Sequence, residues 1–212
     1  MSQTVWIARH GNRIDFVNPD WFLSAAQPYD PHLSECGHVQ AKQLANRLKG
    51  EGISHIFVSP FLRTVQTANY AAEALDLPLK LEWGLCEWLN PEWMPAMPET
   101  MSVEALRARF PRIDPSYTGA VVQYPETAAD CLKRAGETAK RLAAEFPQDI
   151  LLVGHAASVL GTAIGLSGAM ETEINASLCC LVKVVRQNGE WSIELNGDTS
   201  HLTDTETKIR FN

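Results

Sequence analysis

A histidine flanked by arginines follows the first apolar run of the chain. The run Val-Trp-Ile-Ala at 5–8 leads into Arg9 and His10, and Arg13 follows three positions after His10. Two guanidinium groups in an apolar core would need partners of their own, and they would repel a metal cation. The planar, bidentate guanidinium suits phosphate instead. The pattern predicts an anion site in which the neutral imidazole of His10 acts as a nucleophile toward phosphorus.

Three further polar residues each follow a predicted strand. Arg63 comes after the apolar run 53–58, Glu87 after 79–83 and His155 after 149–153. Because the carboxyl ends of parallel strands meet at one edge of a sheet, we expect these side chains to converge on His10. Arg63 and His155 would then hold phosphate oxygens, together with the two arginines beside His10.

Glu87 is the carboxylate available for proton transfer in this set. It would protonate the leaving oxygen and later take a proton from the hydrolytic water. An acid that acts near neutral pH needs a raised pKa, and we expect partial burial beside Leu85 and Trp88 to raise the pKa of Glu87.

The elements that must position these residues alternate between strand and helix. Helices are expected over 34–48, 60–75, 127–146 and 157–166, with Ser34, Ser59 and Thr127 as N-caps of the first three and Pro60 at the first helical position of the second. Apolar runs over 178–185 and 191–195, joined through Asn188-Gly189, predict a hairpin at one edge. The fold class is therefore α/β, a doubly wound, mainly parallel sheet with helices on both faces.

The length of 212 residues suits a single domain, 1–212, with a cap insertion at about 89–124. Prolines interrupt the insertion, and within it only 103–110 is expected to be helical. The loop 14–29 would carry aromatic side chains over the mouth of the site, and the polar tail 198–212 would pack loosely.

Composition excludes several classes of partner. A net charge of −7 argues against a nucleic-acid surface, and no apolar segment reaches the roughly 18 to 20 residues that span a membrane. Five cysteines without regular spacing favour a reducing compartment, with Cys179 and Cys180 as small hydrophobes of a strand. There is also no room for a signal peptide before the first strand, so we expect a cytoplasmic protein. We expect no cofactor, and no metal beside the two arginines that flank His10. A homodimer is left open.

Five ordered motifs resemble the histidine phosphatase superfamily in its phosphoglycerate-mutase-like branch. They are Arg9-His10-Gly11, Leu33-Ser34-x-x-Gly37, Ser59-Pro60-x-x-Arg63-x-x-Gln66-Thr67-Ala68, Gly84-Leu85-x-Glu87 and Gly154-His155. The resemblance covers roughly residues 4 to 166. It implies a phosphohistidine on His10, with Glu87 as proton donor and with Arg9, Arg13, Arg63 and His155 around the phosphate.

Three stretches are similar to the phosphatase domains of the Sts suppressors of T-cell receptor signalling and to ecdysteroid-phosphate phosphatase. They are Arg13-Ile14-Asp15, residues 30–37 (Asp-Pro-His-Leu-Ser-Glu-Cys-Gly) and Glu87-Trp88. Asn12 stands where those relatives usually carry glutamate.

The resulting prediction is phosphomonoester hydrolysis, with a phosphorylated small molecule or a phosphoprotein as substrate. The insertion holds Arg107, Arg109 and Arg112 but no lysine, amid tryptophans and methionines, which favours an apolar or aromatic leaving group. A phosphoglycerate-type mutase is the nearest alternative, since a phosphohistidine can pass its phosphate to another hydroxyl. A non-catalytic phosphate-binding module would need neither His10 nor Glu87, and a metallohydrolase would need a cluster of carboxylates.

Overall fold

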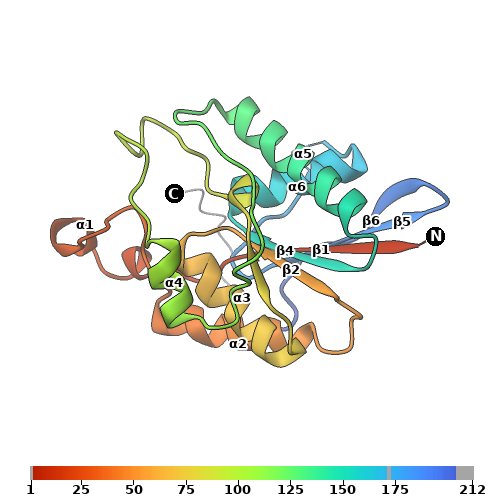
Figure 1. Ribbon diagram of the computed structural model, residues 1–212, viewed down its shortest axis with the longest axis horizontal. Helices are drawn as coiled ribbons and strands as arrows, with labels where there is room; N and C mark the ends of the chain where they lie inside the picture. The colour runs from red at the N-terminus through yellow and green to blue at the C-terminus, as the bar shows by residue number, and fades with distance from the viewer. Residues whose placement is uncertain (1, 171–172, 204–212) are drawn as a thin grey trace.

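The computed structural model describes residues 2–170 and 173–203. Within them the chain forms a six-stranded sheet in the order β3-β2-β4-β1-β5-β6 (Figure 1). The strands are β1 (Gln3–Arg9), β2 (His55–Val58), β3 (Leu79–Leu81), β4 (Ile150–Gly154), β5 (Leu181–Gln187) and β6 (Glu190–Asp198). The pairs β1·β4, β4·β2 and β2·β3 are parallel, and β5 and β6 add an antiparallel edge. This confirms the predicted fold class.

Helices cover both faces of the sheet. On one face lie α2 (Glu35–Arg47), α3 (Leu62–Leu75) and α4 (Val103–Arg109), and on the other lie α5 (Ala128–Glu145) and α6 (Ala156–Ser167) (Figure 1). Strand β1 is buried on both sides, so Trp6 and Ala8 join the first core while Val5 and Ile7 join the second. The alternation follows from the two-residue period of a strand. It places His10 at the end of a strand in which every residue except Thr4 is buried.

Two of the three predicted N-caps are confirmed. The Ser34 side chain accepts from the Gly37 N–H at the start of α2, and Thr127 forms a capping box with Asp130 at the start of α5. The prediction for Ser59 and Pro60 is wrong, because α3 begins at Leu62. The N–H of Leu62 is instead satisfied from a distant segment, by Oδ1 of Asp30 at 2.7 Å.

The hairpin lies at the sheet edge as predicted, with Asn188 and Gly189 at positive φ in its two-residue turn. Its first strand begins at Leu181 rather than 178, so Cys179 and Cys180 are buried outside the strand. Cys179 adopts φ 51° and donates its N–H to the carbonyl of His10. The turn before β5 is therefore attached to the backbone of the candidate nucleophile.

The segment 89–124, predicted as a cap insertion, contributes to the core of the sheet. Its helix α4 confirms the predicted helical stretch, and Leu106, Phe110 and Ile113 fill the core on the α2 and α3 side.

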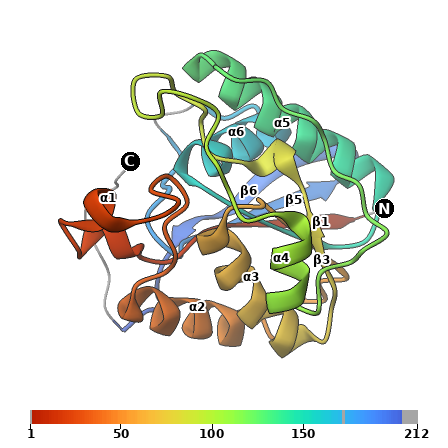
Figure 2. The ribbon, with the colours of Figure 1, turned by 60° about the vertical axis from the view of Figure 1, so that its left-hand side comes forward.

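The loop after β1 contains the short 3-10 helix η1 (Ile14–Phe16) and the helix α1 (Trp21–Ser24), and α1 projects from the body of the molecule (Figures 1 and 2). A short turn, η2 (Trp83–Leu85), precedes Glu87.

The polar tail predicted to pack loosely falls largely at 204–212, outside the described residues. Among the residues that are described, no helix combines the length and apolar character needed to cross a membrane.

Candidate active site

His10 is presented by β1 in a form suited to nucleophilic attack. Its Nδ1 lies 2.7 Å from the carbonyl oxygen of Gly11, so Nδ1 carries the proton and donates it. Nε2 then keeps its lone pair, and no protein atom of the described residues forms a hydrogen bond with it. Burial, reinforced by the charge of Arg63, lowers the pKa of His10 well below its ordinary value. The imidazole is therefore neutral at neutral pH.

The turn after His10 packs tightly against the start of α2. A Cβ at Gly37 would overlap the carbonyl oxygen of Asn12, and a Cβ at Gly11 would lie 2.7 Å from the carbonyl oxygen of Gly37. Asn12 points to this helix as well, since its Oδ1 accepts from the hydroxyl of Ser34 at 2.9 Å. Glycine at 11 and 37 is thus required for the close approach that holds His10 in place.

Arg63, Glu87 and His155 form a buried triangle beside His10. Nη2 of Arg63 lies 3.1 Å from Oε2 of Glu87 and 3.1 Å from Nδ1 of His155, and that oxygen and nitrogen are 3.2 Å apart. The rings of His155 and His10 meet edge to face, with 5.3 Å between centroids. Burial, assisted by Arg13, lowers the pKa of Arg63 to about 10. The structure thus brings together four residues that follow four different strands.

The protonation of Glu87 differs from the prediction. Burial alone would raise its pKa, but the neighbouring His155 and Arg63 outweigh burial and hold the pKa below its ordinary value. Burial lowers the pKa of His155 to about 4, although Glu87 opposes that shift. The expectation of a raised Glu87 pKa is wrong for this arrangement, because the carboxylate faces a cation and a ring nitrogen rather than only Leu85 and Trp88.

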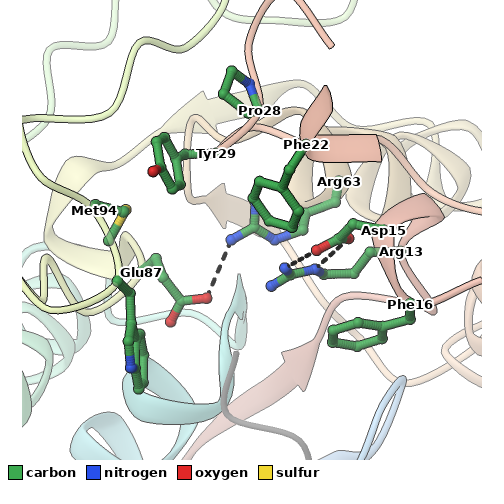
Figure 3. A pocket seen from close by; sticks show the side chains of 10 residues that line it. Arg13, Asp15, Phe16, Phe22, Pro28, Tyr29, Arg63, Glu87 and Met94 are labelled. Carbon is green, nitrogen blue, oxygen red and sulfur yellow. Dashed lines mark hydrogen bonds and ion pairs between the residues drawn. The ribbon is translucent and has the colours of Figure 1, made fainter. Parts of the chain in front are cut away.

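The other two predicted arginines differ in their place. Arg13 lines the pocket and is held by both carboxylate oxygens of Asp15, with Nε 2.9 Å from Oδ1 (Figure 3). Arg9 lies deeper and does not line the pocket; its Nη1 donates to the carbonyl of Ala176 at 2.8 Å. Burial lowers the pKa of Arg9 to about 10, against the attraction of Glu87. Arg9 therefore contributes charge from behind the site.

Several residues that support the site were not predicted to do so. The hydroxyl of Ser59, expected to cap a helix, lies 2.8 Å from Nε2 of His155. Asp15 orients Arg13, and Asp30 lies 3.9 Å from Arg63 while it holds the start of α3. Ser59 and Asp15 fall within motifs quoted above, so the signal was present, but the sequence does not say which group each one contacts.

Arg134 of α5 holds the segment that carries Glu87. Its guanidinium donates to the carbonyls of Gly84, Cys86 and Glu87 at 2.9, 3.3 and 3.2 Å, and it pairs with the carboxylate of Glu126. No motif marks Arg134, because a basic residue on an amphipathic helix is usually solvated. Only the tertiary structure reveals this contact.

The pocket above the triangle encloses about 350 Å³. Its charged lining residues are Arg13, Asp15, Arg63 and Glu87, and its apolar and aromatic ones are Phe16, Phe22, Pro28, Tyr29, Trp93 and Met94. Figure 3 shows Phe22, Pro28 and Tyr29 above the two guanidinium groups and Phe16 below them. One end of the pocket is thus polar, and the walls leading to it are apolar. This confirms that the loop 14–29 brings aromatic side chains to the mouth.

Ligand atoms of His10, Glu87 and His155 all lie within 4.8 Å of one another, a spacing that could hold a metal ion. Nη2 of Arg63, however, is already hydrogen-bonded to both Glu87 and His155. A divalent cation there would face a buried guanidinium, whereas a phosphate oxygen would be attracted to it. The chemistry of the donor set therefore fits an anion better than a cation.

Known proteins are similar to this chain in fold and in sequence. The solved ecdysone phosphate phosphatase from Bombyx mori, in complex with tungstate, superposes with a TM-score of 0.78 at 19% identity, over 99% of this chain and 98% of that one. This likeness supports the fold. A probable phosphoglycerate mutase GpmB of Proteus mirabilis is 29% identical, over 94% of this chain and 95% of its own length.

Two larger eukaryotic proteins match over part of their length. The 55 kDa subunit of yeast transcription factor tau is 31% identical over 78% of this chain, and human ubiquitin-associated and SH3 domain-containing protein A is 28% identical over 74%. The matched regions span 41% and 30% of those two proteins.

A family model describes nearly the whole domain. It is that of the histidine phosphatase superfamily (branch 1), and it matches residues 5–199, which include every predicted site residue. Together with the relatives above, it confirms the resemblance to phosphoglycerate-mutase-like, Sts-type and ecdysteroid-phosphate phosphatase domains. The chain belongs to the histidine phosphatase superfamily.

Proposed function

We propose that the chain hydrolyses phosphomonoesters through a phosphohistidine on His10. The observation that carries the proposal is the lone pair on Nε2 of His10, buried next to Arg63 and His155, which can hold the non-bridging oxygens of a phosphate. Nε2 attacks phosphorus while the bond from phosphorus to the ester oxygen breaks. Water then attacks phosphorus, the P–N bond breaks, and inorganic phosphate leaves.

Glu87 is the proposed acid and base of the two steps. In the first step its carboxyl group gives a proton to the leaving oxygen, and in the second its carboxylate takes a proton from water. Because His155 and Arg63 lower the pKa of Glu87, the carboxylate has to take up its proton when the substrate binds. A phosphate dianion that engages Arg63 competes with Glu87 for this cation and places like charge beside the carboxylate, and both effects raise the pKa of Glu87.

The pocket lining favours hydrolysis of esters with an apolar or aromatic leaving group. Its two cations, Arg13 and Arg63, already have acidic partners in Asp15 and Glu87, and both are needed for the phosphate. The rest of the described lining is aromatic, aliphatic or thioether. A carboxylate or a second phosphate on the leaving group would therefore find no cation of its own there.

Phosphomutase activity is the second candidate, and the relation to GpmB over almost the full length of both chains favours it. A mutase would return the phosphate from His10 to another hydroxyl of a phosphoglycerate. The pocket lining speaks against this outcome, since a phosphoglycerate carries an extra carboxylate.

One panel distinguishes the two candidates. Purified protein is assayed for phosphate release from phenyl phosphate, phosphotyrosine, sugar phosphates, steroid phosphates and 3-phosphoglycerate, with His10→Ala as control and with EDTA to test for a metal. Hydrolysis of the aryl and steroid esters, abolished in His10→Ala and unaffected by EDTA, is the expected result. Strong preference for 3-phosphoglycerate with formation of its isomer would establish the mutase instead.

The proton donor is tested by the basicity of the leaving group. Glu87→Gln should lower kcat/KM for phenyl phosphate, which reports the steps up to cleavage of the P–O bond, by about 10²–10⁴-fold, the usual contribution of general acid catalysis. The loss should be much smaller for p-nitrophenyl phosphate, whose phenolate leaves without a proton. An equal loss for both esters would contradict the role of Glu87 as an acid.

A further inference from the structure

A second apolar hollow adjoins the active-site pocket. Pro28 and Tyr29 line both cavities, so the second, of about 210 Å³, lies directly beside the first. Its remaining lining comes from one stretch of the insertion, Pro95, Ala96, Met97, Pro98 and Glu99. This hollow takes no part in the phosphate chemistry, which lies at the other end of the first pocket.

The chemistry of the hollow suits an apolar group. Prolines on both sides give it rigid walls, and Met97, which is 39% exposed, adds a flexible thioether that adapts to the shape of a ligand. Among its described lining residues the only charged one is Glu99, whose carboxylate repels an anion. A rigid apolar wall that is already formed binds rings with little loss of entropy.

We infer that this hollow is a subsite for a second apolar unit on the leaving group. The inference rests on the proposed function and narrows its substrate class to esters of elongated apolar alcohols or phenols. The phosphate lies at Arg63, the first ring of the leaving group lies between Phe22 and Met94, and the second unit passes Tyr29 to reach Met97. Because Pro28 and Tyr29 line both cavities, one ligand that passes these two side chains can occupy both.

Two non-hydrolysable ligands test the subsite without turnover. Phenylphosphonate fills the first cavity only, whereas 4-biphenylylphosphonate extends a second ring past Tyr29. Calorimetric titration of the wild-type protein should show that the biphenylyl ligand binds at least about tenfold more tightly, because a second ring buries further apolar area. Equal affinities would overturn the subsite.

Two variants locate the effect, and the ratio of the two affinities is the quantity measured. Met97→Asp places a carboxylate in the hollow and Ala96→Trp fills it, and both positions are exposed, so the fold should tolerate both changes. The ratio should fall close to one in each. Val121→Asp is the matched control, since Val121 is 95% exposed and lines neither cavity, and it should keep the wild-type ratio. A ratio unchanged in Met97→Asp and Ala96→Trp would contradict the inference.

Hydrolysis of the corresponding esters separates this inference from the proposed function. Failure to release phosphate from either ester, with the affinity ratio intact, would contradict the proposed function alone. Normal hydrolysis with equal kcat/KM for phenyl and biphenylyl phosphate would contradict the subsite alone. A phosphotyrosyl peptide that binds more tightly than 4-biphenylylphosphonate, and is weakened by Met97→Asp, would assign the hollow to a peptide and overturn the small-molecule class.

Discussion

Glu87 and Arg63 form a buried ion pair in the wall of the pocket, with Oε2 3.1 Å from Nη2. In the proposed mechanism the same guanidinium also binds a phosphate oxygen, and its Nε and Nη1 have no hydrogen-bond partner among the described residues. The proposed acid and the substrate therefore compete for one cation, which couples phosphate binding to proton transfer.

Phosphate binding should take up a proton. His155, Arg63 and Arg13 lower the pKa of Glu87. Arg9 also interacts with the carboxylate, and the ring of His10 packs against that of His155. A bound dianion adds negative charge beside these groups and so raises the pKa of Glu87. The complex then holds more protons than the free protein, so affinity rises as pH falls, by up to about tenfold per pH unit. Phenylphosphonate titrated in buffers of different ionisation enthalpy measures the uptake.

The control for this prediction is Glu87→Gln, which cannot take up the proton. The titration of the ligand itself is the same in both proteins, so the difference between them isolates Glu87. Identical proton uptake by wild type and Glu87→Gln would show that the proton goes elsewhere.

His10 should remain neutral below the pH at which an ordinary histidine titrates. Burial, with Arg63 and Arg9, lowers its pKa from the ordinary value of 6.5, so protonation of the nucleophile starts only at more acidic pH. Ring ¹⁵N or ¹³C resonances of His10, assigned by comparison with His10→Ala, should stay constant from pH 8 to pH 6. A midpoint near 6.5 would show that the imidazole is solvated.

Ser59 should act as a positioning residue through His155. Its hydroxyl, 2.8 Å from Nε2, orients the ring whose Nδ1 faces Glu87 and Arg63. Loss of one such hydrogen bond is worth about 1 kcal/mol, so Ser59→Ala should lower kcat about five- to tenfold with less change in KM. The ¹⁵N shifts of His155 should move as its two tautomers redistribute.

Ser102→Ala is the matched control for Ser59→Ala. Ser102 caps α4 through the Ala105 N–H at 3.2 Å, so this variant should lose about 1 kcal/mol of stability while kcat is unchanged. If Ser59→Ala lowers stability in the same way but leaves kcat and the His155 shifts unchanged, Ser59 is only structural.

Arg134 should couple the stability of the domain to the position of Glu87. Arg134→Met leaves the carboxylate of Glu126 buried without its partner and removes the donors to the carbonyls of 84, 86 and 87. The free energy of unfolding should fall by about 3 kcal/mol, and kcat should fall as well. Urea denaturation and phosphate release measure the two effects.

Lys133→Met, one position earlier, is the control for Arg134→Met. Its ion pair with Glu137 is exposed, so the change in stability should stay within about 0.5 kcal/mol. A loss of stability without any loss of kcat in Arg134→Met would mean that the Glu87 segment holds its position without this contact.

Much of the fold could be predicted from local patterns. Strand and helix alternation, the caps at Ser34 and Thr127, and the Asn188-Gly189 turn each depend on neighbours a few positions away, so a sequence displays them. The start of α3 could not be predicted, since Asp30 satisfies its first N–H from 32 residues away. The start of β5 was misplaced for a similar reason, because the carbonyl of His10 binds Cys179.

By itself, the sequence determined which residues follow the strands. In a parallel sheet this is enough to gather Arg63, Glu87 and His155 around His10, because the strand ends share one edge. The tertiary structure alone decided their states. Three features depend on burial and on contacts in the folded chain: the tautomer of His10, the lowered pKa of Glu87, and the position of Arg9 behind the pocket. A pKa is set by the charges and solvent within a few ångströms, and only the folded chain fixes these.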